Sequence, residues 1–490
     1  MQFSDPLFLF AFLPATLAAY YLCGWWSRQL AMFVLTIASL VAYWFAGLDA
    51  LAVLLASIAV NYGLFLVLTS EHRKGRLAVL WLGVVANLAL LGYFKYRGFF
   101  LENIAAALGD RAQPLKLWVP LGVSFFTFQK VSFLVDAYRG KVKACRPLDF
   151  ALFSTFFPQL TAGPLTRAQE MLPQFSALST RFEAKGFTEG LSIFIVGLAK
   201  KVLIADAMGT IADPAFDAFK GPHTVGAAAA WVGVLAYSMQ IYYDFSGYSE
   251  MALGLAKMVN LKLPCNFNAP YKANSMIAFW ARWHMSLSRW LRDYVFLSIA
   301  NPYHAGKRIL GILGTMLICG LWHGAQWTFV VWGGLHGVFL AVNHVWREVA
   351  ERFPMQTALL TSKRMKPLGR LITFGAVTCA WVFFRAPTPA GAYKMLSAMF
   401  GQSAVAPDFG FMAYPSALVL TVVASTFIAP DTIAIFSRSE PCLEKMPVRR
   451  AGIQWNTGWP SAAVIALLVF LIVRSHMVAA ESVRFTYSNF

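Results

Sequence analysis

His323 is the residue whose sequence context most favours chemistry. It stands between two glycines in the run Gly320-Leu-Trp-His-Gly, after a nearly uncharged stretch that begins at Ile309. An ionisable group within a membrane segment is costly to bury and is therefore a functional candidate by default. Histidine can take a proton near neutral pH, which suits a general base. A buried histidine hydrogen-bonded to a backbone carbonyl explains the position equally well from the sequence alone.

His284 is the second candidate. The spacing of aromatic residues over 279–299 predicts a helix with one aromatic face, lying at a membrane interface or beside a cavity. Its tryptophans, including Trp280 and Trp283, are best interpreted as interfacial anchors. His284 shares their face, where it can direct a proton or a hydrogen bond, whereas Arg282 lies on another face.

Two polar stretches interrupt apolar sequence and supply further candidates. The run from Tyr242 to Glu250 contains Asp244 and Ser246. It can line a polar tunnel or form a hydrogen-bonded turn, and we favour a turn in which Asp244 caps a helix starting near Ser246. Arg167 is a candidate for binding an anionic donor group, and an interfacial anchor explains it as well.

The remaining histidines and the cysteines favour structural roles. His336 follows His323 by 13 positions, which places the two on different faces of a straight helix. Neither carboxylate nor cysteine stands at ligand spacing near these histidines, so we expect no metal site. The six cysteines form no Cys-x-x-Cys pair, and we expect no disulfide framework.

The elements that position these residues follow from composition. Of 490 residues, 58% are hydrophobic and 13% are charged, whereas about 25% is usual for soluble domains. This excludes a water-soluble multidomain enzyme and indicates an all-α, polytopic integral membrane protein in contact with lipid. The net charge of +18 resides largely in short basic runs between apolar segments. That pattern is typical of cytoplasmic loops rather than of nucleic-acid binding.

Apolar segments of near-bilayer length predict the spans. A non-helical backbone at membrane depth must be buried in protein or line a cavity, so Pro and Gly residues in 117–135 and 148–165 indicate at least one re-entrant segment. Loop charges place the N-terminus outside, with the loops 71–76 and 347–368 in the cytoplasm. We expect a single membrane-embedded domain over 1–490. The expected spans are 7–24, 30–46, 50–69, 77–94, 187–205, 225–243, 245–260, 309–327, 328–346, 369–386, 411–430 and 461–480.

The chain resembles the membrane-bound O-acyltransferase family. The resemblance covers nearly the whole chain. Within the family, the chain is most similar to the bacterial branch that contains the alginate O-acetyltransferase membrane subunit and the teichoic-acid D-alanyl transfer protein. The motifs that carry it are Phe157-Pro-Gln with Gly163-Pro and Arg167, Asp244-Phe-Ser-Gly-Tyr-Ser, Asn268-Ala-Pro-Tyr, Phe279-Trp to Asp293-Tyr, Gly320-Leu-Trp-His-Gly-Ala, and Trp381-Val-Phe-Phe-Arg-Ala.

The resemblance implies about eleven transmembrane helices, plus re-entrant helices, around a thin wall pierced by a tunnel. It implies that His323 is catalytic and His284 is a second functional histidine. Trp322, Asp244, Ser246, Arg282 and Arg167 are candidates for substrate or tunnel contacts. The implied donor is acetyl-CoA or another acyl thioester, with no bound cofactor.

The expected activity is O-acetylation of an exported polysaccharide such as alginate, directly or through a periplasmic partner protein beside the synthase complex in the bacterial inner membrane. Acetylation of cellulose or peptidoglycan by the same chemistry is an alternative. A polysaccharide or lipid transporter with a proton relay through His323 and Asp244 is another.

Overall fold

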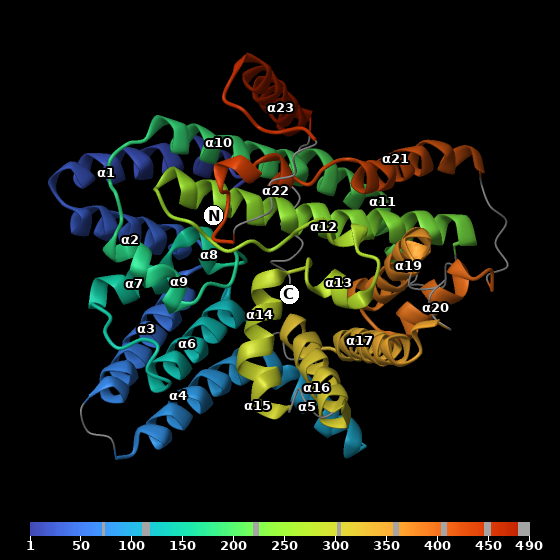
Figure 1. The fold of residues 1–490 in the computed structure, drawn as a ribbon, viewed down its shortest axis with the longest axis horizontal. Helices are drawn as coiled ribbons and strands as arrows, with labels where there is room; N and C mark the ends of the chain where they lie inside the picture. The colour runs from blue at the N-terminus through green and yellow to red at the C-terminus, as the bar shows by residue number, and fades with distance from the viewer. Residues whose placement is uncertain are drawn as a thin grey trace.

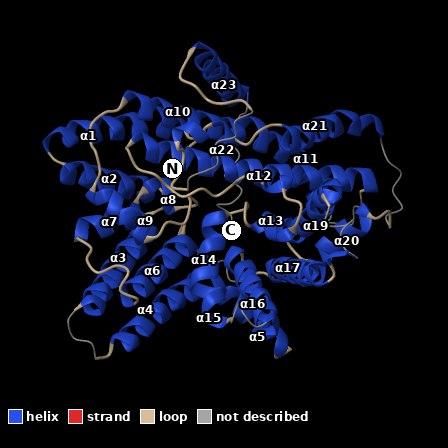
Figure 2. Ribbon diagram, viewed as in Figure 1, coloured by secondary structure: helices blue, strands red, loops and turns tan. Residues whose placement is uncertain are grey.

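A computed structural model describes residues 1–70, 74–109, 118–218, 225–300, 305–355, 362–402, 409–444 and 452–478. Within these ranges the secondary structure is helical, without strands (Figure 2). The loops predicted at 71–76 and 347–368 lie partly outside the described residues, at 71–73 and 356–361. The all-α prediction is confirmed.

The N-terminal quarter consists of apolar helices at the predicted positions, and three of the helical stretches there are long enough to span a membrane: Phe8–Trp26, Leu48–Thr69 and Arg76–Ala107. Apolar residues recur on all sides of these segments, which suits helices that face both protein and lipid. A helical turn of Phe8–Phe12 (η1) leads into α1, and a similar turn of Gly92–Tyr96 (η2) joins α4 to α5. The helices are α1 (Leu13–Trp26), α2 (Arg28–Trp44), α3 (Leu48–Thr69), α4 (Arg76–Leu91) and α5 (Arg97–Ala107).

Short buried helices follow, as the proline and glycine pattern predicted. A helix of nine residues is only about 14 Å long and cannot cross a bilayer. Phe156 separates two such pieces, and most of their residues are buried in protein. In the stretch predicted at 117–135, Pro120 and Gly122 precede the helix rather than break it. The elements are α6 (Val123–Tyr138), α7 (Pro147–Thr155), α8 (Phe157–Leu160) and α9 (Ala168–Ser176).

The central helix α12 (Ala227–Met258) corrects the prediction of two spans at 225–243 and 245–260. It is one continuous helix of 32 residues, crossing the molecule beside α10 (Figure 1). Asp244 lies in its middle and caps nothing. No turn is required there because Lys201 lies 3.3 Å from the Asp244 carboxylate. Lys201 belongs to η3 (Lys200–Ala205), which joins α10 (Ala184–Ala199) to α11 (Asp206–Asp217).

The segment predicted as one helix over 279–299 is broken. It forms α13 (Met276–Trp280), α14 (Met285–Leu291), η6 (Arg292–Phe296) and α15 (Leu297–Ile299). Trp280 and Trp283 are buried, so their interpretation as interfacial anchors is wrong. The aromatic face instead packs against neighbouring helices in the core.

A close helical hairpin carries His323. α16 (Ala305–His323) ends at this histidine, and α17 (Trp327–Arg352) returns along it. A Cβ at Gly320 would lie 2.2 Å from the Phe329 carbonyl oxygen, and one at Gly333 would lie 2.3 Å from that of Met316. The two glycines therefore let the helix backbones touch.

The C-terminal part completes the helical assembly. The remaining helices are α19 (Lys366–Arg385), α20 (Pro389–Met399), α21 (Phe409–Ile428), α22 (Thr432–Ile435) and α23 (Trp459–Val478), with α23 at the edge of the molecule (Figure 1). Among the described residues, six helices are long and apolar enough to span a membrane. The chain is a multi-pass membrane protein, and the number of eleven spans stays a prediction.

Candidate functional site

His323 lies at a cavity of about 480 Å³, which we call the His323 cavity. Its other walls come from the segment before α6, from the turn between α16 and α17, and from the end of α19. The histidine itself is only 2% exposed. The imidazole is thus shielded from bulk solvent yet next to a space large enough for part of a substrate. The lining residues are Lys95, 119–125, Thr161, Trp322, His323, 324–326, Phe329 and 384–387.

Aromatic rings enclose the buried sides of His323. The ring centroids of Trp322, Trp332 and Phe384 lie 4.9, 5.0 and 5.1 Å from that of the imidazole. Trp332 in turn contacts His336, with centroids 4.8 Å apart, and Trp280, at 6.0 Å. We call this layer, made of Trp280, Trp322, Trp332, His336 and Phe384, the aromatic wall.

His284 approaches the same place from α14. It is fully buried, and its ring centroid lies 5.9 Å from that of Trp322, which itself contacts His323. Its backbone adopts the left-handed region, with φ of 42°. A non-glycine residue in this region costs roughly 1–3 kcal/mol and is typical of functional sites. The structure therefore brings the two predicted histidines together across one indole ring.

A second cavity of about 290 Å³ lies on the other side of the aromatic wall. We call it the Trp280 cavity, because Trp280 lines it and also belongs to the aromatic wall. The His323 cavity is at the C-terminal end of α16, whereas the Trp280 cavity follows the stretch Arg308–Met316 toward the opposite end. The remaining lining residues are Ser288, Leu291, Arg292, Phe296, Leu340 and His344. One thin layer of rings thus separates two cavities.

Three N–H groups of the aromatic wall are buried without a hydrogen-bond partner among the described residues. Two are the indole groups of Trp322 and Trp332. Trp280 donates to His336 Nδ1 at 3.3 Å, so the neutral His336 ring carries its proton on Nε2, which is the third. An unsatisfied buried donor costs roughly 1–3 kcal/mol, and such atoms suit the binding of a substrate oxygen.

Comparison with known proteins identifies the family. The model of the membrane-bound O-acyltransferase family matches residues 77–385. The chain belongs to this family. The match includes His284, His323 and the aromatic wall, and the protein is therefore a membrane-bound acyltransferase.

Individual relatives agree with this assignment. The chain is 37% identical to a peptidoglycan O-acetyltransferase of Helicobacter pylori, over 83% of this chain and 81% of the relative. It is 35% identical to a probable alginate O-acetylase of Pseudomonas putida, over 97% of each chain. It is 27% identical to a teichoic acid D-alanyltransferase of Streptococcus thermophilus, over 65% of this chain and 84% of that one.

The other predicted site residues separate into two groups. Trp322 lines the His323 cavity, as a tunnel residue should. Asp244, Ser246, Arg282 and Arg167 are absent from the residues that line either cavity. Asp244 and Ser246 are buried inside α12, and Arg167 forms an ion pair of 2.7 Å with Asp293.

Lys95 is a site residue that the sequence reasoning missed. It lies in η2 and lines the His323 cavity beside His323. The predicted span 77–94 ends just before it, because a basic residue at the end of an apolar stretch is typical of a loop. Its position inside the span Arg76–Ala107, ten or more residues before the helix end, was the available signal.

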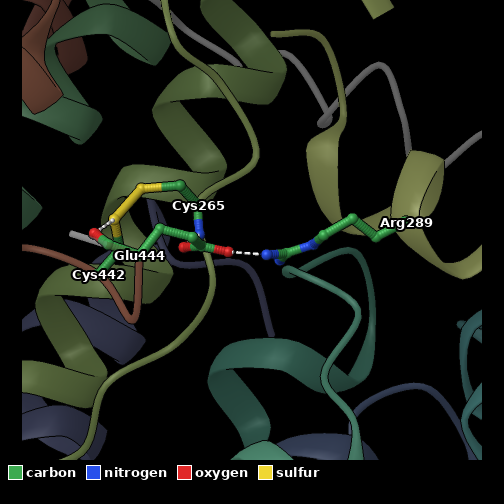
Figure 3. The surroundings of a disulfide bond; sticks show 4 residues. All are labelled: Cys265, Arg289, Cys442 and Glu444. Carbon is green, nitrogen blue, oxygen red and sulfur yellow. Dashed lines mark hydrogen bonds and ion pairs between the residues drawn. A yellow bond between two sulfur atoms is a disulfide. The ribbon is translucent and has the colours of Figure 1, made fainter. Parts of the chain in front are cut away.

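Cys265 and Cys442 correct the expectation that the chain has no disulfide framework. They form a disulfide between segments 177 residues apart (Figure 3). Glu444 lies beside it, accepts a hydrogen bond of 2.7 Å from the Cys265 N–H and pairs with Arg289. Spacing rules for local motifs cannot detect such a distant pair.

The two sulfurs and Glu444 also form the one group of potential metal ligands found within the described ranges. The disulfide bond occupies both sulfurs.

Proposed function

We propose that this protein is an O-acetyltransferase of the bacterial inner membrane, which moves acetyl from a cytoplasmic thioester to a hydroxyl of an exported polysaccharide. The observation that carries the proposal is a buried histidine at a cavity, with a second cavity one layer of rings away. The names of the acetyl-transferring relatives support acetyl as the group transferred.

His323 is the general base in this proposal. A hydroxyl is a poor nucleophile at neutral pH until an adjacent base takes its proton. The imidazole removes the proton as the hydroxyl oxygen forms a C–O bond to the thioester carbon. The C–S bond then breaks, and the leaving thiolate takes the proton from the imidazolium. His284 lies close enough, across Trp322, to orient the acceptor or to polarise the carbonyl.

The aromatic wall supplies donors for the negative charge that develops on the carbonyl oxygen. Fixed N–H groups in a water-poor site stabilise such an oxyanion without reorganising. The indoles of Trp322 and Trp332 both contact the His323 ring, and their N–H groups have no hydrogen-bond partner within the described part of the chain. We assign them to the acyl carbonyl oxygen.

The Trp280 cavity suits entry of the donor. It is lined mainly by apolar side chains, with Arg292, Arg308 and His344 among them. Such a site can hold an acyl-pantetheine arm while basic groups face the donor's phosphates. Arg308 pairs with Glu348 at the start of the predicted cytoplasmic loop, which supports a cytoplasmic opening. Only the acyl arm then has to reach the wall, so charged CoA does not cross the membrane.

The His323 cavity suits the acceptor. The N-terminal Met1 lies near Thr161, and Thr161 also lines the His323 cavity. With the predicted external N-terminus, this cavity opens to the periplasm. The acceptor is the polysaccharide itself or a serine of a periplasmic acetyl-transfer protein acting with the synthase complex. Alginate is our first choice, and peptidoglycan and cellulose are the alternatives.

Reconstituted protein tests the proposal. Proteoliposomes receive acetyl-labelled acetyl-CoA on one side, and alginate, peptidoglycan fragments or a soluble cellulose oligomer on the other. We expect wild type to transfer label to a hydroxyl and His323→Ala to transfer none. A transporter would instead move unlabelled polymer across the membrane without acetyl-CoA, and that result would overturn the proposal. Labelling of a cysteine at Lys74 from the cytoplasmic side alone would support the orientation.

A further inference from the structure

We propose that Lys95 is a positioning residue that fixes the end of α16 and thereby holds His323 in place. The inference rests on the proposed role of His323 as the base. Lys95 reaches His323 from η2, more than two hundred residues earlier in the chain. It therefore couples the N-terminal helices to the catalytic histidine.

The contacts of Lys95 define this role. The last carbonyl groups of an α-helix have no partner within the helix. α16 ends at His323, and Lys95 Nζ donates to the carbonyl oxygens of Trp322 at 2.6 Å and of His323 at 3.1 Å. The third contact is with Ser124 Oγ at 3.2 Å. One ammonium group thus satisfies the two terminal carbonyls of the helix that carries the base.

A cation is the appropriate group at this point. The C-terminus of a helix carries a partial negative charge, which a nearby ammonium stabilises. An ammonium group has three N–H donors, and the three contacts above match that number. Although Lys95 lines the His323 cavity, these three hydrogen bonds go to protein atoms. This distinguishes a positioning residue from one that binds the acceptor.

The neighbouring residue strengthens the same helix end. The Tyr96 hydroxyl donates to the Leu321 carbonyl oxygen at 2.7 Å. Lys95 and Tyr96 together donate hydrogen bonds to three consecutive carbonyl oxygens, those of Leu321, Trp322 and His323. Because Trp322 and His323 side chains both face the reaction, a small displacement of this turn would misplace base and oxyanion donor together.

Steady-state kinetics of Lys95→Met test the proposal. A misplacement of about 1 Å can cost about 10²-fold in rate, so we expect kcat to fall by that factor while KM for both substrates stays within about twofold. Lys257→Met is the control, because Lys257 also donates to a carbonyl, that of Ser439, and lines neither cavity; it pairs with Glu189 as well, at 3.1 Å. We expect this control to keep its kcat. A raised acceptor KM with unchanged kcat in Lys95→Met would show that Lys95 binds substrate and would overturn the proposal.

A second variant, Lys95→Arg, tests the proposal in case Lys95→Met does not fold. Lys95→Arg keeps the cation but cannot place three single donors in the same way. We expect it to accumulate normally, with kcat lowered about tenfold. A wild-type kcat in Lys95→Arg, with Lys95→Met unfolded, would mean that Lys95 only stabilises the protein.

A readout without acyl substrates separates this proposal from the proposed function. Diethyl pyrocarbonate modifies histidine, and mass spectrometry of the His323 peptide gives the rate of its modification. We expect Lys95→Met to change that rate at least threefold and Lys257→Met to leave it unchanged. An unchanged rate in Lys95→Met overturns the positioning role. If Lys95→Met changes the modification rate but the wild type transfers no acetyl, the positioning role stands and the proposed function is overturned.

Discussion

Two buried polar regions of this protein differ in how their charges are balanced. The first is the aromatic wall with His284 and His323. The second, which we call the ion-pair network, consists of Lys200 and Lys201 of η3 with acids of α11, α12 and the segment before α22. Lys201 contacts Asp206 at 2.5 Å and Asp244 at 3.3 Å, and Lys200 contacts Glu250 at 2.5 Å and Asp431 at 3.8 Å.

The difference indicates which region does chemistry. A buried ion pair offsets its own desolvation cost within the protein, and breaking it leaves an uncompensated charge. The aromatic wall instead contains N–H donors without a hydrogen-bond partner among the described residues, and one of them, Trp322, lines the His323 cavity. Both regions contain ionisable groups in apolar sequence, His323 in the first and Asp244 in the second. The pairing of each lysine with acids of neighbouring segments identifies the ion-pair network as structural.

Removal of His323 should have the largest effect. We expect His323→Ala and His323→Gln to lose activity equally, by at least about 10³-fold, and to accumulate normally, because glutamine keeps a hydrogen bond but cannot accept the proton. Acetyl transfer by purified variants in proteoliposomes measures this. Substantial activity of His323→Gln would mean that His323 positions a group rather than removing a proton.

Removal of His284 should have the next largest effect. We expect His284→Gly to lower kcat by about 10²-fold or more. Glycine is the appropriate replacement because it adopts the left-handed backbone without strain. His284→Ala should be similarly inactive but less stable than His284→Gly, since alanine retains the strain of the left-handed backbone. If His284→Gly kept full activity at normal expression, the position would matter only for the backbone.

Most of the fold was predictable from the sequence, because hydrophobic segment length determines spans directly. The spans of α1 to α4, α16, α17 and α19 agree with their predicted ranges. The prediction failed where a polar residue was assumed to require a turn. Asp244 is accommodated inside α12 because Lys201, in a different helix, neutralises it, and no local pattern reveals that pairing.

The site was predictable only in part, for a similar reason. His323 and His284 stood out because their motifs are local, and the structure places both at the wall. Lys95 was missed because its partners are backbone carbonyls more than two hundred residues away. The tryptophans of 279–299 were misjudged, because spacing gives a helix face but does not distinguish lipid headgroups from a protein core.

Two tryptophan variants, one in the aromatic wall and one stacked against it, extend the comparison. Trp332 and Trp381 are equally buried and stack with centroids 5.7 Å apart. The Trp381 indole donates to the Tyr271 hydroxyl at 3.1 Å, whereas the Trp332 indole has no partner among the residues that the structure describes. We expect Trp332→Phe to lower kcat about tenfold or more, because it removes an oxyanion donor. Trp381→Phe should reduce thermal stability with kcat within about twofold. Equal losses of kcat would show that ring packing alone explains Trp332.

The smallest effect on activity should come from the ion-pair network. Asp244→Asn removes one of the acids that pair with Lys201, and breaking a buried pair destabilises by roughly 3–5 kcal/mol. The network lies outside both cavities, so the variant should lose thermal stability and yield while each folded molecule keeps its kcat within about twofold. Thermal unfolding in detergent and acetyl transfer normalised to folded protein measure the two quantities separately. Asp206→Asn is the matched control, because its carboxylate contacts the same ammonium from a less buried position and should destabilise less. A large loss of kcat in Asp244→Asn at unchanged stability would mean that the network takes part in proton movement, as in a transporter. Charge pairing within the protein would then not distinguish structural from functional groups.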